Sequence, residues 1–268
     1  MEFSFDGIGS AAQSMSPAAI PTGHNNKGFF KRALMNLFII AFMFGFVELY
    51  TFCLGSGNGL IGLTISLAII SFWRTDIGIK PLQGAFVIWG AFLLTGGATF
   101  LASFHPAIGV FVNFASIYTI LTLTSHQPMA KAYYPILSCY LFAQSSPVYG
   151  IDYGLRMIGI AGGGLIVAII YYIRHRKVKR RRNITDIFRE THFCSIRTKF
   201  FIRLTTGLTI AMLIGDFYHV LKPAWISFTV LSLVHPFVNE SRKKLAVFYI
   251  SCYLSGSFRT HGILYCLY

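Results

Sequence analysis

The chain has 268 residues, of which 54% are hydrophobic and only 12% are charged, and its mean hydropathy is +0.61. Soluble domains carry about 25% charged residues, so this composition predicts an integral membrane protein. The net charge of +14 would suggest a nucleic-acid partner in a soluble protein. Here the basic residues stand between apolar runs, where they act as orientation signals, and we expect no nucleic-acid binding.

The first 28 residues lack the basic segment and the long apolar segment of a cleaved signal peptide. We interpret residues 1–28 as a disordered cytoplasmic tail. The five cysteines are scattered and include no CxxC spacing, so neither a disulfide framework nor a metal site is predicted.

Apolar runs of membrane-spanning length follow one another along the rest of the chain. A bilayer core about 30 Å thick requires on the order of 20 apolar residues per helix. The predicted helices cover 33–53, 60–73, 82–102, 106–123, 133–149, 153–173, 200–221 and 224–238, with a partial ninth beginning at Leu245. The predicted fold is an all-α polytopic transmembrane bundle of six helices plus a partial second repeat of two to three helices.

The predicted domains follow from this order. Residues 29–173 form a first six-helix transmembrane half, 174–199 a basic cytoplasmic loop, and 200–268 the start of an incomplete second half. Alternate loops carry almost all the basic residues, including the run "RHRKVKRRR" at 174–182. The positive-inside rule then predicts a multi-pass protein of the plasma membrane with a cytoplasmic N-terminus. The basic run either anchors this topology or binds anionic lipid head groups.

Two stretches of the chain resemble each other. The segment 29–45 aligns with 200–215, and the helices that follow align Thr64 with Thr229. The copies lie about 165 to 170 residues apart and have the same predicted orientation, as in transporters built from parallel repeats. The alternative is that two amphipathic segments resemble each other without duplication.

The second copy carries a distinctive pattern. Lys222 and Pro223 form a short turn, Trp225 and Thr229 follow on a helix, and Asn-Glu-Ser-Arg follows at 239–242. With this Pro-x-Trp-x-x-x-Thr pattern and its order of helices, the chain resembles the fusaric acid resistance (FUSC) and aromatic acid exporter family. The resemblance covers roughly residues 29–257. The malate-channel proteins of plants look like distant relatives. The ending "RTHGILYCLY" follows Ser257 without room for further spans, so we expect a C-terminally truncated copy.

Polar side chains inside predicted spans are the candidate site residues, because a charge within the membrane is costly. Glu48 is either a proton-titrating carboxylate or an interfacial residue that reaches water. Asp216 and His219 occupy a similar depth in the seventh span and form a matched cluster with Glu48 if the repeat is real. Asp152 and Arg156 are spaced for an i,i+4 ion pair, and Arg156 is also a candidate for an anion path.

Three further candidates lie in the eighth span. His235 is either a proton relay or a structural residue at a helix end. Trp225 is either an aromatic-belt anchor or a stacking surface for an aromatic substrate, and Thr229 belongs to the family pattern. Glycines of the third and sixth spans, Gly90, Gly96, Gly97, Gly159 and Gly163, are interpreted as packing surfaces.

No enzymatic motif is present: the sequence lacks HExxH, GxSxG and a phosphate-binding loop, so we expect neither an enzyme nor a cofactor. The resemblance implies efflux of small organic anions such as aromatic carboxylic acids by proton-coupled alternating access. The alternatives are a passive anion channel and a non-transporting membrane scaffold. The expected partners are the lipid bilayer and the anion, and a homo-oligomer is left open.

Overall fold

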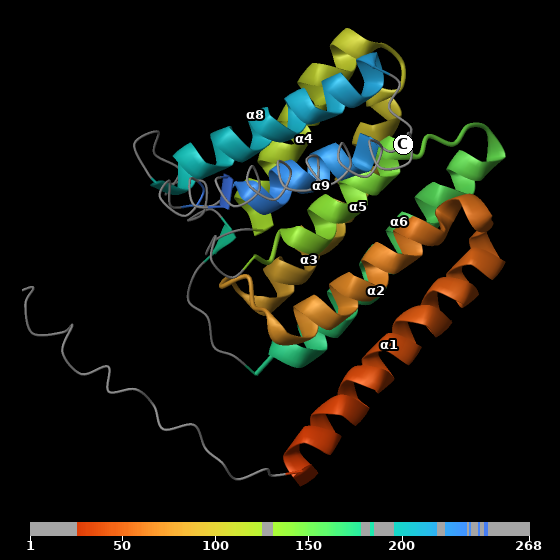
Figure 1. Cartoon of the computed structure of the whole chain (residues 1–268), viewed down its shortest axis with the longest axis vertical. Coiled ribbons are helices and arrows are strands. Elements are labelled where there is room, and N and C mark those ends of the chain that lie inside the picture. The colour runs from red at the N-terminus through yellow and green to blue at the C-terminus, as the bar shows by residue number, and fades with distance from the viewer. Residues whose placement is uncertain are drawn as a thin grey trace, which may run out of the picture. The chain divides into compact units, whose positions relative to one another are not determined.

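The computed structural model describes residues 26–124, 131–177, 183–184, 196–218, 223–234, 236, 241 and 244–245; of these, the side chains of 26–29, 31, 32, 106, 196 and 223 are not described. Its elements are helical (Figure 1). They are α1 (Asn26–Leu54), the 3-10 turn η1 (Ser56–Asn58), α2 (Gly59–Arg74), α3 (Pro81–Ala102), α4 (Pro106–Thr124), α5 (Tyr134–Ser145), α6 (Ile151–His175), α8 (Ile196–Phe217) and α9 (Pro223–Leu233). No strand occurs in these residues, which confirms the all-α prediction.

The chain divides into two compact units, Met1–Phe42 and Met43–Tyr268, and α1 runs through the boundary. In the first unit, residues 33–42 of α1 are apolar apart from Asn36 and largely exposed, with Phe38 73% and Leu37 62% accessible. The second unit contains the last part of α1 and the helices from α2 to α9.

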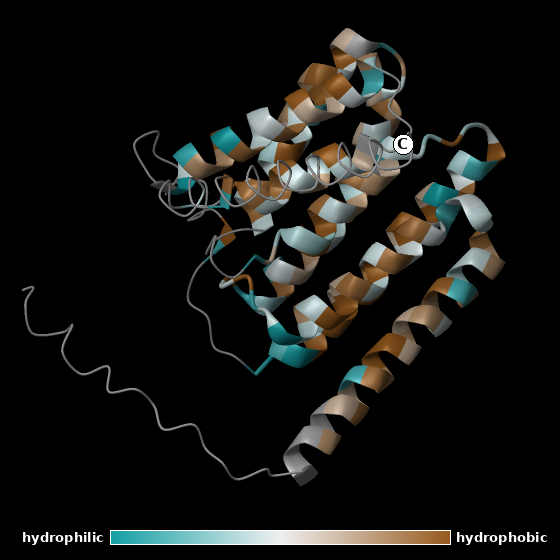
Figure 2. Cartoon of the chain, in the orientation of Figure 1, coloured by the Kyte–Doolittle hydropathy of each residue, from teal (hydrophilic) through white to brown (hydrophobic). Residues whose placement is uncertain are grey.

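In the part of the chain that the structure describes, six helical segments are long and apolar enough to cross a membrane. They are Ala33–Leu54, Ser56–Arg74, Pro81–Ala102, Ala107–Thr124, Ile151–His175 and Arg197–Phe217. Large apolar side chains remain exposed on them, such as Phe111 of α4 and Ile158 of α6. Figure 2 shows hydrophobic residues along the helices of the second unit and hydrophilic ones mainly near helix ends. This arrangement suits helices surrounded by lipid, so the chain is a multi-pass membrane protein.

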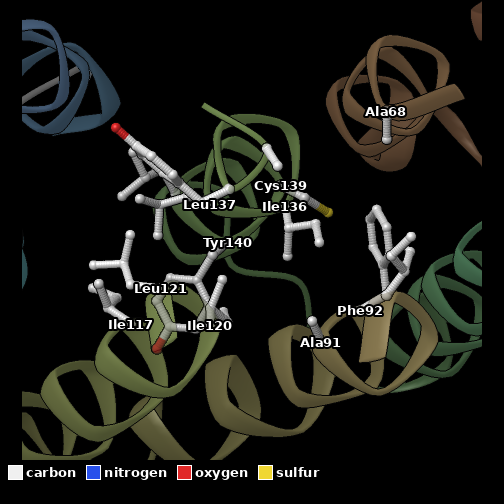
Figure 3. Close-up of a cluster of buried hydrophobic side chains, with 14 of the residues drawn as sticks. Ala68, Ala91, Phe92, Ile117, Ile120, Leu121, Ile136, Leu137, Cys139 and Tyr140 are labelled. Atoms are coloured by element: carbon white, nitrogen blue, oxygen red, sulfur yellow. The ribbon is translucent and has the colours of Figure 1, made fainter. Parts of the chain in front are cut away.

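The fifth predicted span is shorter than expected. α5 has 12 residues, about 18 Å of helix, because Ser146 precedes Pro147 and a residue before proline disfavours helical backbone. α5 is buried on nearly every side against α2, α3, α4 and α9. Figure 3 shows its Ile136, Cys139 and Tyr140 among side chains of the neighbouring helices. A short, mostly apolar helix that is buried on nearly every side is therefore the centre of the bundle.

α9 is also shorter than predicted. The expected helix extends to residue 238, whereas the described helix ends at Leu233, just before His235 and Pro236. The proline has no N–H to donate and disfavours helical backbone at the preceding residue, so the helix stops there.

The glycines of α6 allow close packing, as predicted from the sequence. A Cβ on Gly159 would collide with the Tyr50 hydroxyl of α1, and one on Gly163 would collide with Ile65 of α2. The space beside Gly96 of α3 is likewise filled by Met157. The same prediction is wrong for Gly90 and Gly97, because a Cβ added to either would have nothing within 4 Å and would face open space.

Two interhelical hydrogen bonds join α3 to α6. The indole Nε1 of Trp89 donates to the carbonyl of Ala161 at 3.2 Å, and the hydroxyl of Tyr153 donates to the carbonyl of Gly96 at 2.8 Å. Each bond satisfies a polar group inside an apolar bundle, where an unpaired group would be costly. α3 and α6 are thereby held in a fixed register beside the central α5.

Candidate functional site

A pocket of about 660 Å³ lies between α2, α5 and α9. Three aromatic side chains line it: Phe142 from α5, and Trp225 and Phe228 from α9. The other lining residues are Leu60, Leu63, Thr64, Leu67, Ser138, Ser145, Ser146 and Ala224. The pocket therefore joins helices of the predicted first half to a helix of the predicted second half.

The walls of this pocket are largely apolar even where residues carry hydroxyls. Thr64 donates to the carbonyl of Ile61 at 2.8 Å, and Ser145 and Ser146 both donate to the carbonyl of Phe142. Phe142 and Phe228 pack with ring centroids 4.8 Å apart at an angle of 49°. A flat apolar group is the ligand that such walls favour, since aromatic rings gain from stacked and tilted contacts with one another.

Both short helices have an end at the pocket. The C-terminal end of α5 contributes Ser145 and Ser146, and the first turn of α9 contributes Ala224 and Trp225. The first N–H groups of a helix have no acceptor within it, and this end carries a partial positive charge. The start of α9 is thus a weakly electropositive spot beside an apolar wall.

Arg156 lies next to the pocket, on α6, and is only 2% exposed. Its Nε donates to Oδ1 of Asn58 at 2.9 Å, and its Nη2 donates to the carbonyl of Gly57 at 2.9 Å. Its Nη1 donates to the carbonyls of Ala143, at 3.3 Å, and of Ser146. The guanidinium thus joins α6 to the turn before α2 and to the end of α5.

The turn that receives Arg156 has its own local requirements. Gly55 adopts φ +89°, a conformation that glycine adopts without strain, and η1 follows directly. Asn58 donates from Nδ2 to the carbonyl of Leu54 at 2.7 Å while its Oδ1 accepts from Arg156. One amide side chain therefore satisfies the end of α1 and a buried cation together.

The ion pair predicted between Asp152 and Arg156 does not form in the described structure. Among the described residues the guanidinium makes no ion pair with Asp152, whose side chain is exposed. All the acceptors of Arg156 are neutral, and two are carbonyls at or just beyond the end of α5, where the helix dipole favours a cation. The positive charge stays inside the bundle without a carboxylate.

The structure places the other predicted site residues at separate locations. Trp225 lines the pocket, and Thr229 donates to its own helix at the carbonyl of Trp225, at 2.8 Å. Asp216 borders a second pocket between α4 and α8. Glu48 is exposed and lines neither pocket, so the structure does not bring it together with Asp216. His219 and His235 lie outside the described residues.

Sequence reasoning missed Phe142, Phe228 and Asn58. The two phenylalanines stand in runs that are apolar throughout, where no periodicity separates a pocket wall from a lipid-facing side. Asn58 has a signal, because it is the amide side chain in a turn that is otherwise glycine and serine. Nothing in the sequence indicates that it pairs with Arg156, which lies 98 positions later in the chain.

A comparison of the chain with family models, with curated proteins and with solved structures finds no match.

Proposed function

We propose that the protein exports small organic anions, such as aromatic carboxylates, by proton-coupled alternating access. The observation that carries this proposal is the pocket between α2, α5 and α9, with Phe142, Trp225 and Phe228 in its walls. Its volume of about 660 Å³ is within the range of small-molecule sites, about 300–1,000 Å³. An aromatic ring fits walls of this chemistry.

Groups at one end of the same pocket favour the negative charge of the proposed substrate. Backbone N–H groups in the first turn of α9 are suited to a carboxylate, as at other helix N-termini. The cation of Arg156 lies behind Ser146, which lines the pocket. Because no carboxylate neutralises Arg156 in the described bundle, its field favours an anion nearby.

The position of the pocket also suits a transporter. Short or interrupted helices whose ends meet at a binding site are typical of secondary transporters built from repeats. α5 and α9 are both too short to cross the hydrocarbon core alone, and both end or begin at the pocket. The resemblance to the aromatic acid exporter family, carried by Pro223, Trp225 and Thr229, supports the same substrate class.

The proposed orientation has the N-terminus in the cytoplasm of a cell whose plasma membrane holds the protein. Arg174 at the end of α6 lies over the ring of Trp73 at the end of α2, at 5.6 Å from its centroid. These two helix ends thus share basic residues and an aromatic ring, as expected at a cytoplasmic interface. The acidic residues Glu48 and Asp216 are the proposed proton carriers.

The test is efflux from proteoliposomes that contain the purified full chain and radiolabelled benzoate. We expect benzoate to leave faster when a pH gradient is imposed than when the gradient is collapsed with a protonophore. Large benzoate currents without dependence on the pH gradient would identify the passive channel instead. Absence of benzoate flux under either condition would support the scaffold and contradict the export proposal.

A further inference from the structure

Eight threonine side chains are buried in the described bundle, and they fall into two groups. Five donate to a carbonyl of their own helix at 2.6–2.9 Å: Thr64, Thr95, Thr99, Thr122 and Thr124. Such back-bonding is the usual way in which a transmembrane threonine satisfies its hydroxyl. The three buried threonines of α8, Thr198, Thr205 and Thr209, have hydroxyls with no partner in the structure.

The three unpaired hydroxyls lie on one face of α8. At about 100° per residue, positions 198, 205, 209 and 216 fall within about 40° of one another. Thr209 and Asp216 line the same pocket, which places this face toward α4. The side chains of Thr205 and Thr209 are 0% and 5% exposed, so their hydroxyls are removed from bulk solvent.

The pocket between α4 and α8 is more polar than the one between α2, α5 and α9. It has a volume of about 340 Å³ and is bordered by Asn113, Thr209 and Asp216. Asn113 accepts a hydrogen bond at Oδ1 from the hydroxyl of Tyr140, at 2.6 Å, so its amide nitrogen is the group left for a pocket ligand. A space of this size holds on the order of ten water molecules.

A small gap leads from this pocket toward the apolar one. Asp216 borders it, together with Gln144, Ser145 and Ala224, and the last two also line the pocket between α2, α5 and α9. The Oε1 of Gln144 is buried and has no hydrogen-bond partner in the structure. The gap measures about 10 Å³, about enough for one water molecule.

We propose that the space between α4 and α8 is an aqueous cleft, in which water hydrogen-bonds to the free threonine hydroxyls of α8 and reaches Asp216 and Gln144. Buried polar groups in native structures have partners, and ordered water supplies them where the protein does not. A dry seam would leave three hydroxyls and one amide oxygen unpaired inside an apolar bundle, at a substantial cost for each. The inference does not depend on anion export, because its test measures water and not transport.

Thiol labelling tests the cleft directly. The five native cysteines are first replaced, and Thr205→Cys and Thr209→Cys are made one at a time in the full chain in liposomes. The probe is a charged, water-soluble methanethiosulfonate. The controls are Thr95→Cys, a buried threonine that is back-bonded, and Ile210→Cys, an exposed neighbour on α8.

We expect Thr209→Cys to react about tenfold or more faster than both controls, because only the thiolate reacts and apolar burial raises the pKa of a thiol. A rate equal to that of Thr95→Cys would overturn the proposal. Thr209→Val gives a second readout on the native background. The valine should lower the midpoint of thermal unfolding if water occupies the cleft, whereas a raised midpoint would show that the seam is dry.

Discussion

Arg156 and Asn58 lie 98 positions apart in the chain, yet Nε of the arginine donates to Oδ1 of the asparagine at 2.9 Å. The contact closes α6 onto the turn that connects α1 to α2, and the same guanidinium also holds the end of α5. One buried side chain therefore positions α6, the turn that leads into α2 and the end of α5, and Ser146 at that end lines the pocket. Arg156 therefore has a structural role in addition to being a candidate for anion binding.

The first prediction concerns this junction. Arg156→Met should destabilise the protein by about 3 kcal/mol, because it leaves the buried amide oxygen of Asn58 and several carbonyls without a donor. Chemical unfolding in mixed detergent micelles measures the change. Asp152→Asn should leave stability within about 0.5 kcal/mol of the parent, because its side chain is exposed. An equal loss of stability in the two variants would indicate that Asp152 and Arg156 form an ion pair after all.

The second prediction compares two glycines of α6 that lie two positions apart. A Cβ on Gly164 would lie 2.6 Å from the Cβ of Phe92, whereas one on Gly162 has nothing within 4 Å. Gly164→Ala should therefore cost about 1–3 kcal/mol through overpacking of α6 against α3. Gly162→Ala should be neutral or stabilising by up to about 1 kcal/mol, from helix propensity. The unfolding midpoints of the two variants measure these changes in stability. If both variants were destabilised, or both stabilised, the packing of α6 against α3 described here would be refuted.

The third prediction concerns the aromatic wall. Trp225→Ala should weaken benzoate binding about fivefold, since an aromatic pair contributes about 0.5–1.5 kcal/mol beyond its buried area. Trp73→Ala removes another exposed tryptophan, outside this pocket, and should leave affinity unchanged. Equilibrium binding of labelled benzoate by scintillation proximity gives both constants. A loss of affinity that is equal in the two variants would point to the membrane interface and not to the pocket.

The fourth prediction separates the proposed proton carriers. Glu48→Gln and Asp216→Asn should each reduce the part of benzoate efflux that depends on the pH gradient, if the residue carries the proton. Asp152→Asn is the matched control, because it removes an exposed carboxylate from the start of α6. Flux assays in proteoliposomes at two imposed gradients measure the effect. Unchanged efflux in Glu48→Gln would remove that residue from the mechanism.

The fifth prediction concerns topology. With the N-terminus inside, Ser56→Cys should react with an impermeant thiol reagent added to intact cells, and Lys131→Cys should react only after permeabilisation. Both positions are exposed and lie outside the long helices, so accessibility alone does not distinguish them. The native cysteines are replaced beforehand. The reverse pattern of labelling would invert the orientation derived from the basic loops.

Much of the fold could be predicted from local properties of the chain. The runs that become α2, α3, α4 and α6 have bounds within two residues of those predicted, because the length and hydropathy of a span are local quantities set by bilayer thickness. Small residues in α6 likewise indicated close packing. The fifth span was misjudged because apolar residues continue past the point where Pro147 ends the helix.

Less of the candidate site than of the fold could be predicted from the sequence. Trp225 could be chosen as a candidate because a tryptophan next to a proline stands out, whereas Phe142 and Phe228 are two of 26 phenylalanines. In an apolar chain, the residues that face lipid and those that face a pocket have the same composition, so sequence patterns do not separate them.

The amino-acid sequence was enough to establish that this is a helical membrane protein and roughly where its helices lie, since both follow from local hydropathy. Only the packing of the helices decided which groups meet. It paired Arg156 with Asn58 and not with Asp152. It also left three buried threonine hydroxyls of α8 without a hydrogen-bond partner, that of Thr209 beside a cavity, while other buried threonines bond to their own helix. These outcomes depend on contacts between distant segments, which local periodicity does not encode.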